Sequence, residues 1–152
     1  MKPPRPNNPK IMPTIRHLIQ VKATPKAVYG ALATEVGLRS WWTADAEGGS
    51  TEGENLTVGF YHRAVVFRFT VTALKPNEKV VWLCHGDDPD WNNTQITWQI
   101  EPTESGATIK FFHADWLEED DHFASSNTTW GMLMHQLKGC LEGSVLGPKW
   151  PE

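Results

Sequence analysis

The segment 125–143, which reads SSNTTWGMLMHQLKGCLEG, constrains the fold more than any other part of the chain. Its apolar residues recur at intervals of three and four, so they share one face of an α-helix. They are Trp130, Leu133, Met134, Leu137 and Leu141. Residues 125–127 offer N-cap side chains, and Gly143 with Pro148 fits a left-handed end of the helix. A long amphipathic helix of this kind requires a sheet to pack on.

Short segments of alternating polarity supply the strands of that sheet. They are residues 15–21, 55–62, 64–75, 79–85, 94–101 and 107–115. Thr24-Pro25 predicts the start of a short helix over 25–33, and a second short helix is expected over 35–41. Tight turns join successive strands, so the sheet is antiparallel. The predicted class is α+β: a curved antiparallel sheet of about six to seven strands, two short helices after the first strand, and the long C-terminal helix inside the curve.

Composition limits the domain count and the possible partners. We expect one domain over 14–152, preceded by a flexible tail over 1–13 that holds five prolines. A net charge of −4 without a basic cluster argues against a nucleic-acid partner, and no apolar run approaches membrane-spanning length. Cys84 and Cys140 lack metal or redox spacing, so we expect reduced thiols, a cytoplasmic location and no cofactor.

The second unusual feature is the set of aromatic residues expected to point from the sheet toward the helix. They are Phe67, Phe69, Trp82, Trp98, Phe111 and Trp130. Such rings either fill a core or form the wall of a ligand cavity. Met134 would add a pliable surface, and Tyr61, His17 and His113 would add polar groups. These ten residues are the predicted ligand-binding set.

The two histidines are the candidates for chemistry. If Ile15 pairs with Asp115, then His17 lies opposite His113, with Cβ atoms about 4.5–5.5 Å apart. Two such imidazoles can share a proton, bind a metal or hold a polar group, or they can simply be hydrogen-bonded core residues. No third ligand is apparent, so no metal site is predicted. The acidic residues within 87–90 and 118–121 are expected to lie on the solvated surface. Trp91 is expected to fold back as a lid over the sheet edge.

Five stretches, taken in order, resemble a known family. They are IQVKATPKAVYGALAT, LRSWWT, DPDWNNTQITWQIEP, GATIKFFHADW and TTWGMLMHQLKGCLEGSVLGP. Together they resemble the START-like, or helix-grip, superfamily that includes polyketide cyclase-like proteins. Within it the chain is similar to the branch of homologues of the activator of the heat-shock-protein ATPase.

The resemblance implies a cavity between sheet and helix that binds hydrophobic or amphipathic small molecules. Members with the heat-shock activator role carry an additional N-terminal domain, and the tail over 1–13 is too short to supply one.

Three functions follow from these observations. The first is binding of a small hydrophobic or aromatic ligand in the cavity, by a monomer or a homodimer. The second is a cyclase, dehydratase or hydrolase that uses His17 or His113 as acid or base, although no catalytic template occurs in the chain. The third is a protein-interaction or stress-response module that docks through the convex sheet or through Trp91 and Trp150.

Overall fold

The computed structural model describes residues 12–86 and 88–152, so most of the predicted tail lies outside the described residues. The chain forms a seven-stranded antiparallel sheet in the order β1-β7-β6-β5-β4-β3-β2. The strands are β1 (Ile15–Val21), β2 (Asp45–Gly48), β3 (Asn55–Phe60), β4 (Val65–Lys75), β5 (Lys79–His85), β6 (Gln95–Thr103) and β7 (Gly106–Ala114). The helices are α1 (Pro25–Ala33), α2 (Glu35–Trp41) and α3 (Asp121–Leu141).

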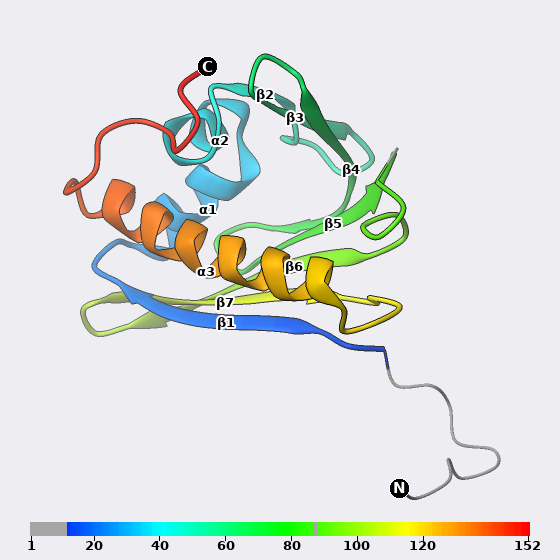
Figure 1. The fold of residues 1–152 in the computed structure, drawn as a ribbon. Coiled ribbons are helices and arrows are strands. Elements are labelled where there is room, and N and C mark those ends of the chain that lie inside the picture. The colour runs from blue at the N-terminus through cyan, green and yellow to red at the C-terminus, as the bar shows by residue number, and fades with distance from the viewer. Residues whose placement is uncertain (1–11, 87) are drawn as a thin grey trace, which may run out of the picture.

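The sheet curves around α3, which lies along its concave side, while α1 and α2 close one end (Figure 1). The predicted α+β helix-grip class is therefore confirmed. The seventh strand, β2, pairs with β3 and ends at Gly48, directly before Gly49. Both glycines have positive φ angles, 83° and 89°, which glycine adopts without steric cost. No helix among the described residues has both the length and the hydrophobicity needed to cross a bilayer.

The two short helices form as the sequence predicts. The Thr24 hydroxyl accepts a hydrogen bond from the Ala27 N–H (3.1 Å), and Pro25 occupies the first turn of α1. Thr34 ends α1 and begins α2, since its hydroxyl accepts a hydrogen bond from the Gly37 N–H (2.9 Å). A single threonine therefore separates the helices and fixes the corner between them.

Helix α3 begins five to seven residues earlier than predicted. Its N-cap is Asp120, whose carboxylate accepts a hydrogen bond from the Phe123 N–H (3.0 Å), so the expected cap at residues 125–127 is wrong. Negative charge is favourable at a helix N-terminus, which explains why the acidic segment joins the helix. The predicted end is confirmed: Gly143 has a φ of 79°, and the Ser144 N–H returns to the Gly139 carbonyl (2.9 Å).

The apolar face of α3 packs into an aromatic core. Trp130, Leu133, Met134 and Leu137 are each at most 2% exposed. Across from them, the ring of Trp42 stacks between Trp41 (centroids 5.7 Å apart) and Trp82 (5.9 Å). The helix and the sheet are therefore joined mainly by aromatic contacts, whose burial is a major stabilising contribution.

The expected pairing of His17 with His113 is wrong by two residues. Ile15 pairs with His113, and His17 pairs with Phe111. Asp115 lies beyond the end of β7 and has a φ of 70°, so it cannot extend the ladder. A shift of two residues keeps every side chain on the same face, so alternation alone could not detect it.

His113 is a fully hydrogen-bonded core residue. Its Nδ1 accepts a hydrogen bond from the Trp130 indole N–H (3.1 Å), and its Nε2 lies 2.8 Å from the Thr94 hydroxyl. Because Nδ1 is an acceptor, the proton of the neutral ring lies on Nε2 and is donated to Thr94. Thr94 in turn donates to the Trp91 carbonyl. Burial, followed by the nearby His122, lowers the pKa of His113 from 6.5 to about 3.

Replacing Leu137 with Ala should lower the free energy of unfolding by about 2–5 kcal/mol, because this α3 side chain is fully buried in the core. Urea denaturation followed by circular dichroism measures the change. The matched control is Met132→Ala on the same helix, where the side chain is 39% exposed and the expected change is within about 0.5 kcal/mol. Equal effects at both positions would contradict the described orientation of α3.

Stability should fall as the pH drops below 6.5 because of His113. The unfolded chain protonates this histidine near pH 6.5, whereas the folded chain resists protonation down to a pKa of about 3. His113 therefore adds a slope that approaches about 1.4 kcal/mol per pH unit by pH ~5. In denaturation curves between pH 6.5 and 5, His113→Gln should flatten this slope, whatever its effect on absolute stability. An unaltered slope in His113→Gln would refute the assignment.

Candidate functional site

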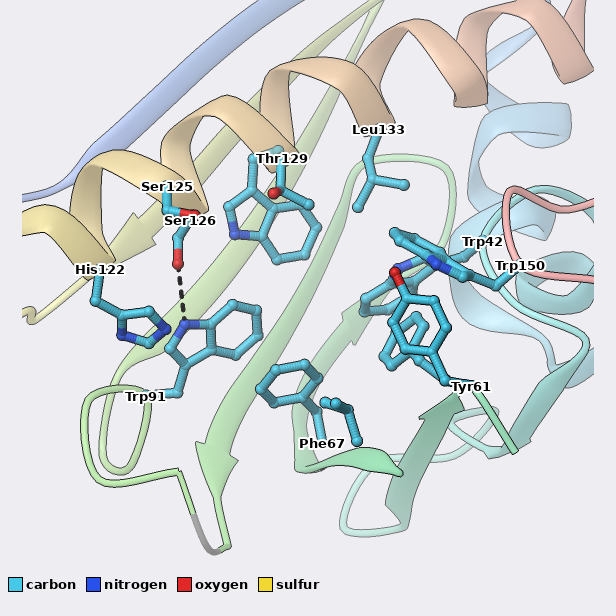
Figure 2. A pocket seen from close by; sticks show the side chains of 13 residues that line it. Trp42, Tyr61, Phe67, Trp91, His122, Ser125, Ser126, Thr129, Leu133 and Trp150 are labelled. Carbon is cyan, nitrogen blue, oxygen red and sulfur yellow. Dashed lines mark hydrogen bonds between the residues drawn. The ribbon is translucent and has the colours of Figure 1, made fainter. Parts of the chain in front are cut away.

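A cavity of about 210 Å³ lies between the first half of α3 and the end of the sheet formed by β3 and β4. Figure 2 shows Ser125, Thr129 and Leu133 reaching it from α3, with Phe67 and Trp91 on the opposite side. Its lining is mostly aromatic and aliphatic, with hydroxyl groups and one histidine among the polar members. The lining residues are Trp42, Phe60, Tyr61, Val65, Phe67, Trp91, His122, Ser125, Ser126, Thr129, Trp130, Leu133 and Trp150. An apolar cavity with a few polar groups is the usual form of a small-molecule site.

Trp91 forms one wall of the cavity and is only 8% exposed. The loop before β6 positions it: the Asp88 carboxylate accepts hydrogen bonds from the N–H groups of Asp90 (2.9 Å) and Trp91 (3.3 Å). The Trp91 ring stacks on Phe67 (centroids 4.2 Å apart), and its indole N–H donates to the Ser126 hydroxyl (3.4 Å), as Figure 2 shows. The expected lid is therefore a packed wall of the site.

Tyr61 stands at the opposite end of the cavity on the turn between β3 and β4. Tyr61, His62 and Arg63 all have positive φ angles (52°, 55° and 66°), a conformation that costs a non-glycine residue about 1–2 kcal/mol. An ion pair between Arg63 and Asp45 (2.8 Å) holds the turn to β2. Strained backbone of this kind persists where surrounding contacts enforce it, and it often occurs at ligand sites.

The C-terminal segment completes this end of the cavity. The Trp150 N–H donates to the Trp42 carbonyl (3.1 Å), and the Ala44 N–H donates to the Trp150 carbonyl (2.9 Å). These bonds place the Trp150 ring edge-on against Phe60, with centroids 4.8 Å apart. The wall is thus built from residues nearly one hundred positions apart in the sequence.

The polar end of the cavity carries a cluster of titratable groups. His122, on the first turn of α3, lies with Nδ1 2.8 Å from an Asp90 carboxylate oxygen and Nε2 3.9 Å from Asp88. The Nδ1 atom is buried but makes no directed hydrogen bond, so its contact with Asp90 is electrostatic. Asp88, Asp90 and His122 are the group among the described residues whose ligand atoms approach closely enough to hold a metal ion. No sequence pattern indicates this cluster, because His122 is 32 positions away from Asp90.

The predicted ligand-binding set divides into two groups. Tyr61, Phe67 and Trp130 line the cavity. The others pack in the core or beneath the helix without lining it: His17, Phe69, Trp82, Trp98, Phe111, His113 and Met134. Apart from Tyr61, the predicted set lacks the lining residues contributed by loops, by the first turns of α3 and by the C-terminal segment. Alternation within strands cannot identify these residues, since they lie outside the strands. The set also lacks Phe60 and Val65, which pair where β3 ends and β4 begins.

His17 and the two thiols lie outside the cavity. His17 contacts α3 where Gly131 leaves room for it: a Cβ at that position would lie 3.3 Å from the His17 ring. Cys84 and Cys140 are both free thiols. Burial raises the pKa of Cys84 to about 12, so this sulfur is protonated and unreactive at neutral pH. Burial also raises the pKa of Cys140.

Known structures share this architecture. The Aha1 dimer from Colwellia psychrerythraea is 36% identical, with a TM-score of 0.81, covering 88% of this chain and 98% of that one. The AHSA1-like protein from Aeromonas hydrophila is 12% identical, with a TM-score of 0.67 and coverage of 86% and 93%. Protein MLL2253 from Mesorhizobium loti is 17% identical, with a TM-score of 0.74 and coverage of 88% and 100%. These last two show the fold alone.

The family model described as activator of Hsp90 ATPase homolog 1-like protein matches residues 22–142. No curated protein matches the chain. The match extends from just after β1 to just beyond the last residue of α3, so it includes the helix and every cavity-lining residue except Trp150. The chain therefore belongs to the family of proteins that resemble homologue 1 of the activator of the Hsp90 ATPase, within the START-like superfamily.

Proposed function

We propose that this protein binds a small hydrophobic or aromatic molecule in the cavity between α3 and the β3–β4 end of the sheet. The observation that carries the proposal is the cavity lining, in which the rings of Phe67, Trp91 and Trp130 face a space of about 210 Å³. This volume is below the range of about 300–1,000 Å³ typical of drug-sized ligands. The cavity therefore suits a molecule of one or two rings, or the buried end of a longer amphiphile.

Apolar burial and aromatic contact supply the binding energy in this proposal. Removing apolar surface from water contributes roughly 25 cal/mol per Å². The hydroxyl groups of Ser125, Thr129 and Tyr61 offer hydrogen bonds to a polar substituent. Native mass spectrometry of protein gently purified from its host tests the proposal, because a bound ligand would appear as a mass that denaturation removes.

No observation favours acid–base catalysis by the two histidines. His113 has both ring nitrogens hydrogen-bonded, and neither His113 nor His17 reaches the cavity. A general acid or base must lie within hydrogen-bond reach of its substrate. For the interaction module, Trp91 is buried and Trp150 is half-buried, so these two do not form an exposed aromatic patch.

The homodimer and the cytoplasmic location are also proposals. The similar Colwellia protein is a dimer, which favours the same assembly here. Free Cys84 and Cys140 are consistent with a reducing compartment. Sedimentation equilibrium should give twice the 17.1 kDa chain mass, and a mass of 17.1 kDa at all accessible concentrations would exclude the dimer.

Filling the cavity should abolish ligand binding while leaving the fold intact. Thr129→Trp places a large ring into the cavity from an exposed helix position. Titration with N-phenyl-1-naphthylamine, whose fluorescence rises in apolar sites, should show binding at least about tenfold weaker than wild type, or ~1.4 kcal/mol. The matched control is Thr128→Trp, one residue away on the same helix and outside the lining. Equal affinity of both variants, or no binding by wild type, would contradict the proposed site.

A further inference from the structure

The charge of the cavity restricts the ligand more narrowly than its shape does. None of the cavity's lining residues is a lysine or an arginine. His122 is the lining residue whose side chain can carry a positive charge, and the carboxylates of Asp88 and Asp90 lie at 3.9 and 2.8 Å from it. In either protonation state of His122, these three groups sum to a negative charge. The polar end of the cavity is therefore negative.

The start of α3 does not reverse this sign. A helix N-terminus carries a partial positive charge that attracts anions. Here the Asp120 carboxylate already accepts a hydrogen bond from the Phe123 N–H (3.0 Å), and Asp121 lies in the first turn. Glu118 and Asp120 line a neighbouring surface pocket together with Asp90, so they add negative charge around that aspartate. An anionic ligand group would find the helix end occupied.

The aromatic walls of the cavity also provide no positive charge for an anion. The faces of Trp91 and Phe67 stack at 4.2 Å, and Trp130 lies parallel to Trp91 at 5.8 Å. These stacked faces cover one another, so the rings offer a ligand apolar contact and no positive charge. A carboxylate or sulfonate buried here would lose its hydration without gaining a cationic partner, which is strongly unfavourable.

We infer that the cavity selects a flat aromatic ligand whose polar end is neutral or positively charged, and that it discriminates against anions such as fatty acids and aromatic carboxylates. This inference rests on the proposed ligand-binding function and adds the charge of the ligand to it. The rings of the ligand would lie along Phe67, Trp91 and Trp130, with the polar end toward His122 and the two aspartates.

Three naphthalene derivatives with one ring system test the inference: 2-naphthol, 2-naphthylmethylammonium and 2-naphthoate. Their binding is followed at pH 7 in about 0.1 M salt by NMR, through shifts of the indole N–H signals of ¹⁵N-labelled protein. Tryptophan fluorescence is not used, because naphthalene fluorescence overlaps with it. EDTA is present, so that no metal ion occupies Asp88, Asp90 and His122. The neutral and cationic compounds should bind with similar affinity, and naphthoate should bind at least about tenfold more weakly.

A charge variant identifies the groups responsible. Replacing both Asp88 and Asp90 with Asn should strengthen naphthoate binding and weaken ammonium binding, with little effect on naphthol. The control replaces Glu101 and Glu104 with Gln, which changes the net charge equally on the distant β6–β7 hairpin. The control should retain the wild-type order of affinities for the three compounds, since exposed charges beyond the Debye length of about 10 Å are screened.

The outcomes separate the inference from the function beneath it. Naphthoate that binds as tightly as naphthol overturns the charge selectivity and leaves ligand binding standing. If the Asp88/Asp90 variant keeps the wild-type order of affinities for the three compounds, the role assigned to these aspartates is overturned. If none of the three compounds shifts an indole signal, both the aromatic-ligand function and the inference fail.

Discussion

The contact of Trp130 with the sheet is the interaction on which the rest of the structure depends. Its indole N–H binds Nδ1 of the buried His113, while its ring lies 4.4 Å from Phe111 and 5.8 Å from Trp91. The bond to His113 also fixes the imidazole tautomer, so that Nε2 donates to Thr94 and Thr94 holds the backbone of Trp91. One side chain of α3 thereby sets the helix on the sheet and positions the cavity wall.

In this arrangement some aromatic residues fill the core, whereas others line the cavity. Trp82, Trp98 and Phe111 are fully buried and fill the space beneath the middle of α3. Toward the first turns of α3, Phe67 and Trp91 line the cavity, and Trp91 also contacts the helix through Ser126 and Trp130. Protein interiors are otherwise close-packed, so a cavity lined by large rigid rings marks a site more clearly than the number of tryptophans does. We infer that its acidic end then favours neutral or positively charged ligands over anions.

Much of the fold could be predicted because it follows from local patterns. The α3 face, the helix pair marked by Thr24-Pro25 and the strand alternation all depend on residues close in sequence, and all were found. The pairing of His17 with His113 failed, since any even shift of β1 preserves the same inward face. The first turn of α3 was missed because Ser125, Ser126 and Asn127 are as good N-caps as Asp120.

The sequence by itself determined the class of the protein: a one-sided antiparallel sheet around a long apolar helix, with rings directed between them. Periodicity fixes which face of each element is buried, and burial of that face determines the layers. Only the tertiary structure decided where the rings stop packing and a cavity begins. That depends on sheet curvature and on Trp91, His122 and Trp150, which come together from two loops and a helix start. Contacts between distant segments leave no period in the sequence, so their chemistry becomes visible only after folding.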